Sequence, residues 1–383
     1  MSISYIPDAV KLRLWGKAAG RCQYGGCNAP LWLDELTQFE FNAAYIAHIV
    51  ADSPDGPRGH PEQSSRLRTD PSNLMLLCDK HHRLVDIADV GGHPRERLEA
   101  MKAEHERRIE ITGGIQPARK TEVLLYGANI GAHASPVNYV AAAEAVMPDR
   151  FPADRRGIAL GMKGSMLQDR DQSFWQVESD QLLRSFATQV TPRLAEGSLQ
   201  HVSVFSVAPQ PLLVRLGTLL SDLPDAEVFQ LHREPRGWRW PETGEGPQFI
   251  VTEPTATRGP PALVLSISAT VTDKRIVDVL GSDAAIWRIS LATPNNDALR
   301  SREMLGAFRR TARTILDRIK AMHGEMALLH LFPAAPVSAA VEFGRVWMPK
   351  ADLRLRLYDE QKQLGGFVHA MDIGEMPVGA AHA

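Results

Sequence analysis

The chain has 383 residues, of which 44% are hydrophobic, so two or three domains with a sizeable core are expected. Its net charge of -2 argues against a protein that coats nucleic acid indiscriminately, because such proteins are basic. No apolar run comes close to the length of about 20 residues that a membrane span needs. The first residues also lack an apolar signal region. We therefore expect a soluble, cytoplasmic protein.

The first 112 residues are expected to form one small domain. Helical apolar spacing over residues 8–19 starts at Asp8, a plausible N-cap, and stops at Gly20. The following elements are predicted in chain order: a strand over 41–50, a loop over 51–72, an extended piece over 73–78, and helices over 79–88 and 94–111. A strand pair followed by a helix around one site is the ββα-metal arrangement.

Residues 113–120 are typical of a linker. Residues 121–383 differ from the first 112 in their pattern, because predicted strands and helices alternate along them. Predicted strands cover 122–126, 201–207, 226–231, 262–268, 285–291 and 326–332, and predicted helices cover 135–146, 179–195, 209–221, 301–322 and 336–346. Apolar strands that alternate with helices indicate an α/β fold with a parallel sheet covered on both faces. The size suggests two α/β halves, roughly 121–240 and 241–383.

The three cysteines of the chain all lie before residue 80 and form, with one histidine, the pattern C-x4-C…C-x2-H. The members of this pattern are Cys22, Cys27, Cys78 and His81. Two short-spaced pairs of soft ligands suit tetrahedral zinc. The alternative is that the cysteines are buried core thiols and that the histidine is incidental.

His82 must face a different direction from His81, because neighbours on a helix point about 100° apart. Asp86 lies four residues further on, on the same helical face as His82. This pair could hold a hard divalent cation such as Mg²⁺. A solvated helix carboxylate is an equally good interpretation of Asp86.

His48 follows a strand-like run, and Asn73 precedes another. A neutral imidazole at His48 could take a proton from water while a metal stabilises the charge on a scissile phosphate. Asn73 could orient His48 or bind the metal. A single histidine after an apolar run is more often structural, and a single asparagine before one is usually a cap or turn residue. The combined order His48…Asn73…His82, nested between the cysteine pairs, favours a catalytic site.

Residues 20–86 resemble an HNH endonuclease domain of the zinc-knuckle type, with the knuckle formed by the Cys/His pattern above. The resemblance implies that His48 is the general base, Asn73 the middle asparagine and His82 a metal ligand. It also implies double-stranded DNA as substrate, with Arg58, Arg66 and Arg68 of a local basic patch that includes His60 as backbone contacts. One departure is Ala47, where many members have a metal-binding Asp or His. Asp86 is the candidate replacement.

Residues 326–347 are predicted to form an apolar strand, a Pro-x-x-Pro-x-Ser-Ala turn and an apolar helix that ends near a glycine. This segment, with the Phe174-Trp175 pair, resembles a SAVED domain, a cyclic-oligonucleotide sensor made of two CARF-like, Rossmann-type halves. HNH joined to SAVED is the architecture of an effector of CBASS, the bacterial anti-phage signalling systems. The resemblance implies a cyclic di- or trinucleotide activator and a homo-oligomer, formed or rearranged on ligand binding, that degrades DNA.

Candidate ligand residues are aromatics that could stack on bases and polar groups that could pair with phosphates. They are Tyr126, Lys163, Trp175, Pro333 and Ser338. Trp238 and Trp240 are expected to pack rather than bind. The basic helix over 301–322, with Arg302, Arg309, Arg310 and Arg313, is expected to be a solvated face or an assembly surface.

Two other classes of function fit the same residues. The first is a non-catalytic regulator that holds nucleic acid under ligand control, and Ala47 is its best support. The second is an ungated restriction-type nuclease whose α/β domain recognises the target sequence.

Overall fold

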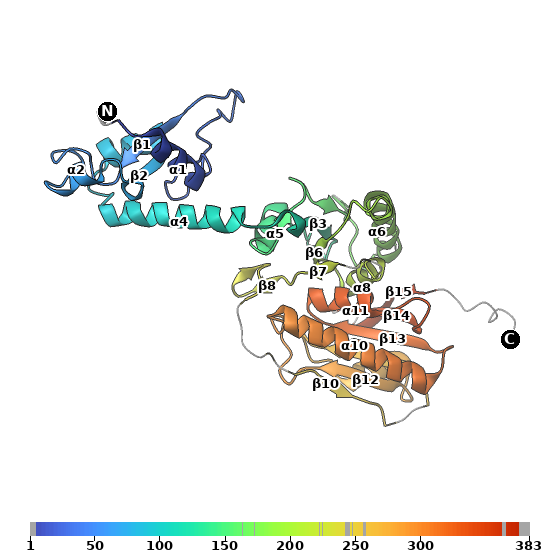
Figure 1. Ribbon diagram of the computed structural model, residues 1–383. Helices are drawn as coiled ribbons and strands as arrows, with labels where there is room; N and C mark the ends of the chain where they lie inside the picture. The colour runs from blue at the N-terminus through green and yellow to red at the C-terminus, as the bar shows by residue number, and fades with distance from the viewer. Residues whose placement is uncertain are drawn as a thin grey trace. The chain divides into compact units, whose positions relative to one another are not determined.

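The computed structural model describes residues 5–162, 164–171, 173–221, 223, 225–241, 246, 248–255, 258–361 and 365–374. The chain divides into two compact units, Met1–Gln116 and Pro117–Ala383, and the division falls inside the segment predicted as a linker. Each unit has its own elements, shown in Figure 1. No helix of the described residues is long and apolar enough to span a membrane.

The described residues of the N-terminal unit, 5–116, form one antiparallel strand pair and four α-helices. Its elements are α1 (Asp8–Ala18), β1 (Ala44–His48), α2 (Gln63–Leu67), η1 (Pro71–Asn73), β2 (Leu74–Cys78), α3 (Asp79–Arg83), η2 (Leu84–Ala88) and α4 (Arg95–Gly113). The predicted helix over 79–88 is therefore a turn of α-helix followed by a π-helical turn. The core joins α1, β2 and α4 through Leu14, Leu76 and Leu98.

The first half of the C-terminal unit has a parallel sheet in the order β4-β3-β6-β7, with β5 also paired to β3. Its elements are η3 (Pro117–Arg119), β3 (Lys120–Gly127), α5 (Tyr139–Val146), β4 (Phe151–Pro152), β5 (Ile158–Ala159), α6 (Phe174–Gln189), α7 (Thr191–Ala195), β6 (Val202–Val207), α8 (Gln210–Leu219), β7 (Ala226–Val228) and the hairpin β8 (His232–Arg233) and β9 (Arg236–Gly237). The helix α5 starts later than predicted because the Asn138 side chain caps it.

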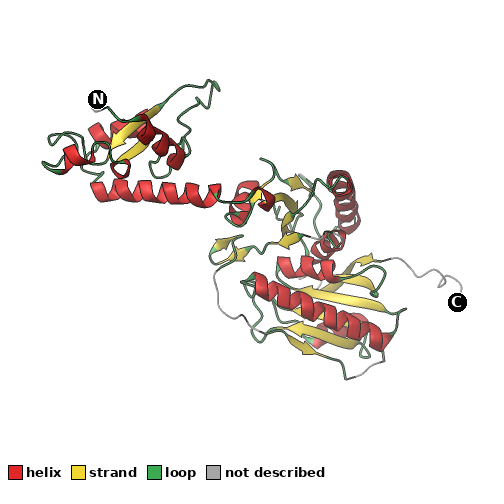
Figure 2. Cartoon of the chain, in the orientation of Figure 1, coloured by secondary structure: helices red, strands yellow, loops and turns green. Residues whose placement is uncertain are grey.

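In the second half, the described residues form a six-stranded sheet in the order β10-β12-β11-β13-β14-β15. Its elements are β10 (Ile250–Thr252), β11 (Pro261–Ser266), α9 (Asp273–Leu280), β12 (Ala285–Ser290), α10 (Arg302–His323), β13 (Leu328–Ala334), α11 (Val337–Val346), β14 (Arg354–Gln361) and β15 (Gly366–Ile373). The central strands are parallel, and both edge strands are antiparallel to their neighbours. Figure 2 shows this alternation of helices and strands.

Alternate residues of β11 explain why helices cover both faces of the second sheet. Leu263 shares a core with Phe308 of α10, whereas Val264 shares the opposite core with Ile276 of α9. Figure 1 shows α10 lying across one of these faces. The predicted α/β class with a sheet covered on both sides is therefore confirmed, although β10, α9, β14 and β15 were not predicted.

The helices α8 and α11 cross where each has a glycine. A Cβ atom on Gly217 would overlap the Val341 carbonyl oxygen, and one on Gly344 would overlap the Val214 carbonyl oxygen. Because α8 belongs to the first half and α11 to the second, this contact joins the two halves with backbone against backbone. Only glycine permits such an approach.

We predict that Gly217→Ala lowers the free energy of unfolding of the C-terminal unit by about 1–3 kcal/mol, because the added methyl forces the helices apart. Gly306→Ala is the matched control, since its nearest neighbour is a flexible arginine end 3.6 Å away. It should raise helix stability by up to about 1 kcal/mol. Urea denaturation of both variants checks this, and equal stabilities would contradict it.

Candidate functional site

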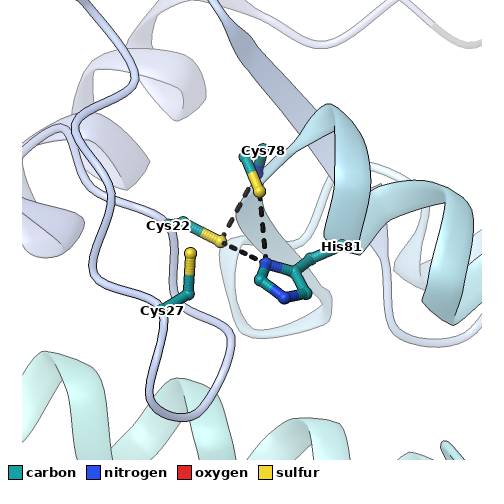
Figure 3. Close-up of side chains that lie close together, drawn as sticks. All are labelled: Cys22, Cys27, Cys78 and His81. Carbon is teal, nitrogen blue, oxygen red and sulfur yellow. Dashed lines mark hydrogen bonds between the residues drawn. The ribbon is translucent and has the colours of Figure 1, made fainter. Parts of the chain in front are cut away.

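The four residues of the C-x4-C…C-x2-H pattern come together in the N-terminal unit. Cys22 and Cys27 lie in the turn after α1, Cys78 ends β2, and His81 lies in α3. Their ligand atoms all lie within 4.8 Å of one another. Figure 3 shows the His81 Nδ1 atom facing the sulfurs, 3.2 Å from Cys78 Sγ and 3.7 Å from Cys22 Sγ. We call these four residues the clasp.

The surroundings of the clasp suit a soft cation. Burial raises the pKa of the Cys22 thiol to about 12, so a thiolate there needs a positive partner such as a metal ion. Burial lowers the pKa of His81 and so favours the neutral imidazole, which is the form that ligates metals. Three sulfurs and one imidazole nitrogen match the donors of structural zinc sites. The clasp is compatible with a zinc site, and it is the one such group of three or more among the described residues.

Tyr24 packs against the clasp, although it was not predicted from the sequence as a site residue. Its ring stacks on His81 with centroids 4.1 Å apart and planes within 3°. Its hydroxyl lies 3.0 Å from His93 Nε2, and His93 Nδ1 lies 2.7 Å from the Asp89 carbonyl oxygen, which can only accept. The signal for Tyr24 was its position between the two cysteines of the knuckle.

His48 ends β1 and is held by the main chain of the loop. Its Nε2 lies 2.9 Å from the Arg68 carbonyl oxygen. Since a carbonyl oxygen only accepts, Nε2 carries the hydrogen, and the neutral ring keeps its lone pair on Nδ1. That arrangement suits a general base. The preceding residue, Ala47, points to the opposite side of the strand and is buried in the core.

Asn73 is buried and bonds to the loop after β1 rather than to the His48 ring. Its side-chain oxygen accepts from the Val50 amide at 2.8 Å, and its nitrogen donates to the Val50 and Leu67 carbonyl oxygens. The amide thus ties both ends of the loop that supports His48. Its effect on His48 is through the backbone, so the prediction of a direct side-chain contact or metal bond does not match this geometry.

His82 and Asp86 come together as the helical spacing predicted. His82 Nε2 lies 3.3 Å from an Asp86 carboxylate oxygen, and the ring of the exposed Tyr45 stacks on His82 with centroids 4.6 Å apart. The other Asp86 oxygen accepts from Arg58 at 2.5 Å. Asp86 is therefore an ion-pair partner here, which leaves it less available as the replacement metal ligand.

Arg58 differs from its predicted role as a DNA contact. Its side chain is 8% exposed, and its guanidinium donates to the Ile49, Val85 and His48 carbonyl oxygens as well as to Asp86. The sequence placed it in a polar loop, where cations usually face solvent, but the loop folds back onto the π-helical turn. Arg66 and Arg68 are exposed, as backbone contacts to DNA must be.

The candidate ligand residues of the C-terminal unit do not line one pocket. Tyr126 and Trp175 belong to the main core, Pro333 is buried in β13 opposite Leu265 of β11, and Lys163 lies outside the described residues. Ser338 is fully buried, and its hydroxyl donates to the Gln230 side-chain oxygen at 2.7 Å. It joins the two halves instead of facing solvent. Trp238 packs edge-on against Phe205, as expected for a core residue.

A cavity of about 300 Å³ lies at the carboxyl end of β3. Ligands of parallel sheets commonly bind at this end of the strands. Gly127 and Gly161 line it, and the backbones approach so closely that a Cβ atom on Gly161 would overlap the Gly127 carbonyl oxygen. Asn129 donates to the carbonyl oxygens of Ser165 and Leu167 and so fixes the far wall. The sequence signal for this cavity was a glycine directly after an apolar strand, Gly127, and it was not among the predicted ligand residues.

Comparison with known proteins defines the class of the C-terminal unit, a sensor of two α/β halves. The family model described as "SMODS-associated and fused to various effectors sensor domain", SAVED, matches residues 182–373, which is half of the chain. The chain belongs to the SAVED family. No curated relative matches it.

Among solved structures, the chain is similar to the Acinetobacter baumannii Cap4 SAVED/CARF-domain containing receptor with the cyclic trinucleotide 2'3'3'-cAAA, at 13% identity and a TM-score of 0.45, covering 82% of this chain and 62% of that one. The same receptor with 3'3'3'-cAAA gives 16% identity, a TM-score of 0.44 and the same coverage. The Moraxella osloensis receptor gives 11% identity and a TM-score of 0.41, covering 73% and 59%. The chain spans about three fifths of the length of these receptors.

We predict that Arg58→Met destabilises the N-terminal unit by about 2–4 kcal/mol, because it leaves Asp86 and three carbonyl oxygens without their donor. Arg66→Met, at an exposed position of α2, is the control and should change stability by less than about 0.5 kcal/mol. Thermal denaturation followed by circular dichroism measures both. An Arg58→Met protein as stable as the control would show that the guanidinium contributes nothing.

Proposed function

We propose that this protein is a CBASS effector: a cyclic-oligonucleotide-activated, metal-dependent endonuclease that degrades double-stranded DNA in bacterial anti-phage defence. The C-terminal unit is the sensor, in keeping with the SAVED family. The N-terminal unit is the nuclease, of the HNH type that residues 20–86 resemble. The observation that carries the nuclease assignment is His48, whose Nε2 is bonded to a carbonyl oxygen and whose Nδ1 is therefore free to accept a proton.

The roles divide between two sites in the N-terminal unit. Zinc in the clasp is structural and holds the turn after α1 against α3. His82 would hold a second divalent cation, Mg²⁺ or similar, which would supply charge stabilisation to the scissile phosphate, while His48 activates the water. Because Asp86 is paired to Arg58, the protein would offer this cation few ligands, which suits Mg²⁺ because that ion keeps several of its waters. Arg66 and Arg68 contact the backbone.

Ligand control follows from the pairing of a sensor with a weakly charged enzyme. With a net charge of -2, one copy attracts DNA poorly. Several copies together bring their exposed Arg66 and Arg68 side chains onto one surface and raise the affinity. The activator, a cyclic di- or trinucleotide, binds in the cavity at the carboxyl end of β3 and promotes this assembly.

The test is plasmid cleavage by the full chain with Mg²⁺, with and without a panel of cyclic di- and trinucleotides that includes 2'3'3'-cAAA and 3'3'3'-cAAA. Cleavage should require one member of the panel, and His48→Ala should slow it by at least about 100-fold, the usual contribution of general base catalysis. His369→Ala, an exposed histidine of β15, is the control.

Two outcomes would replace the proposal. Ligand-dependent DNA binding without cleavage would identify a non-catalytic regulator. Sequence-specific cleavage without any added nucleotide would identify an ungated restriction-type nuclease.

For the clasp, we predict about one equivalent of zinc per chain by elemental mass spectrometry, as structural zinc sites bind one ion. His81→Ala and Cys78→Ser should lose the metal to a chelator and unfold the N-terminal unit at lower temperature, because metal binding contributes to folding. His369→Ala should retain both metal and stability. Metal-free wild-type protein with an unchanged melting temperature would mean that the sulfurs are ordinary core thiols.

A further inference from the structure

A second, larger cavity lies between the two halves of the C-terminal unit, with a volume of about 990 Å³. One wall comes from α8, through Arg215, Thr218 and Leu219. The facing walls come from the end of α10, the segment 347–354 and the end of β15. Leu328 and Arg354, the first residues of β13 and β14, also line it, so it lies at the amino ends of these parallel strands. The usual ligand edge of a parallel sheet is the opposite one.

Arg215 is the group that makes this cavity chemically unusual. Its side chain is partly buried, and burial lowers its pKa, which means that the cation lacks compensating charge. Among the described residues its guanidinium makes no hydrogen bond and no ion pair, and the charge of Asp180 acts on it only from a distance. A half-buried arginine without a partner is costly unless an anion comes to it.

Other cations face the same space. Lys350 is exposed on the rim, and no described residue pairs with it. Lys320 donates to the Ala351 carbonyl oxygen at 2.8 Å and lies 3.2 Å from Glu325. Arg354 also lines the cavity. Several cations that converge on one cavity favour a ligand with more than one negative charge.

Two carboxylates that line the cavity, Asp352 and Asp372, already have partners. Asp352 accepts from Arg313 and from the Met348 amide at 2.7 Å, and Asp372 accepts from Arg356 at 2.8 and 2.9 Å. They therefore do not neutralise Arg215. In the neighbouring cavity beside α10, the partly buried Arg313 and Arg345 are each paired with a carboxylate, unlike the partly buried Arg215.

The remaining walls are apolar and include Leu219, Met326 and Pro349. The volume is at the upper end of the usual range for small-molecule sites, about 300–1,000 Å³. A ligand with an anionic end for Arg215 and a flat, apolar body for these walls fits this description. Phosphate matches the planar fork of arginine, and a nucleobase matches the apolar wall.

We propose that this cavity binds a small phosphorylated ligand of nucleotide size, with its phosphate between Arg215 and Lys350. The site is separate from the cavity at the carboxyl end of β3, which the proposed function assigns to the activator. Because Arg215 lies in the first half and Lys350 in the second, a bound phosphate joins the halves. Its binding free energy is then coupled to any rearrangement of the halves that a second ligand causes.

The experiment is isothermal titration calorimetry on the full chain at low salt with inorganic pyrophosphate, AMP and ATP as probes. Wild-type protein should bind at least one of them, and the affinity should fall with added KCl because of charge screening. Arg215→Gln and Lys350→Gln should each weaken binding, the former by roughly 10- to 100-fold, as for loss of a charged hydrogen bond. Arg184→Gln, an exposed arginine of α6, is the control and should bind as the wild type does.

The stability of the variants without ligand separates a binding role from a structural one. Arg215 has no partner among the described residues, so Arg215→Gln should melt at or above the wild-type temperature. A large drop in melting temperature would mean that Arg215 is structural, and it would overturn the proposal. So would the absence of binding by all three probes, or equal weakening in Arg215→Gln and Arg184→Gln. None of these results depends on DNA cleavage, so the proposal and the proposed function fail separately.

Discussion

The register of β1 against β2 sets the arrangement of the N-terminal unit. Ala44 pairs with Cys78 at one end of the five-residue ladder, and His48 pairs with Leu74 at the other. At about 3.4 Å per residue, the two ends lie roughly 14 Å apart. One strand pair therefore carries the clasp residue Cys78 at one end and His48 at the other. A slip by one residue would turn His48 into the core and Ala47 towards the loop.

Apolar side chains of both halves of the sensor share one core, and contacts of main-chain atoms with small or polar side chains add to it. The glycines of α8 and α11 bring these helices together, Ser338 donates to Gln230, and Gln210 donates to the Ala335 carbonyl oxygen at 2.8 Å. Hydrogen bonds with defined geometry fix one relative position of two packed layers more strictly than apolar contacts do. The halves thus have one defined relative position, on which the cavity between them depends.

The sequence predicts those features of the structure that depend on residues close together in the chain. The clasp was predictable because its residues form two short-spaced pairs of the kind typical of zinc sites, and this spacing is visible without knowing how the rest of the chain folds. The strand β14 was missed because RLRLYDEQ alternates charged and apolar residues, and a charged alternation suits an edge region as well as a loop. The main strands were found because a sheet covered on both faces requires continuous apolar runs.

The side-chain roles were harder to predict because they depend on tertiary contacts. Tyr126 and Trp175 were proposed as stacking residues, but large aromatics contribute so much apolar area that the core takes them up. Arg58 was assigned to solvent because its neighbours in sequence are polar. Its guanidinium instead replaces water for carbonyl oxygens that the loop leaves unpaired. Neither outcome is visible without knowing which segments fold against each other.

The bond between His48 and position 68 uses only a main-chain acceptor. Every amino acid has this carbonyl oxygen, so the proton on Nε2 depends on the path of the backbone and not on which residue occupies the position. The exposed Arg68 side chain is then free to change without altering the tautomer of the histidine. Position 68 therefore combines a main-chain acceptor that any residue supplies with a side chain that can vary, so the charge of the surface near His48 can change while the hydrogen bond to Nε2 stays the same.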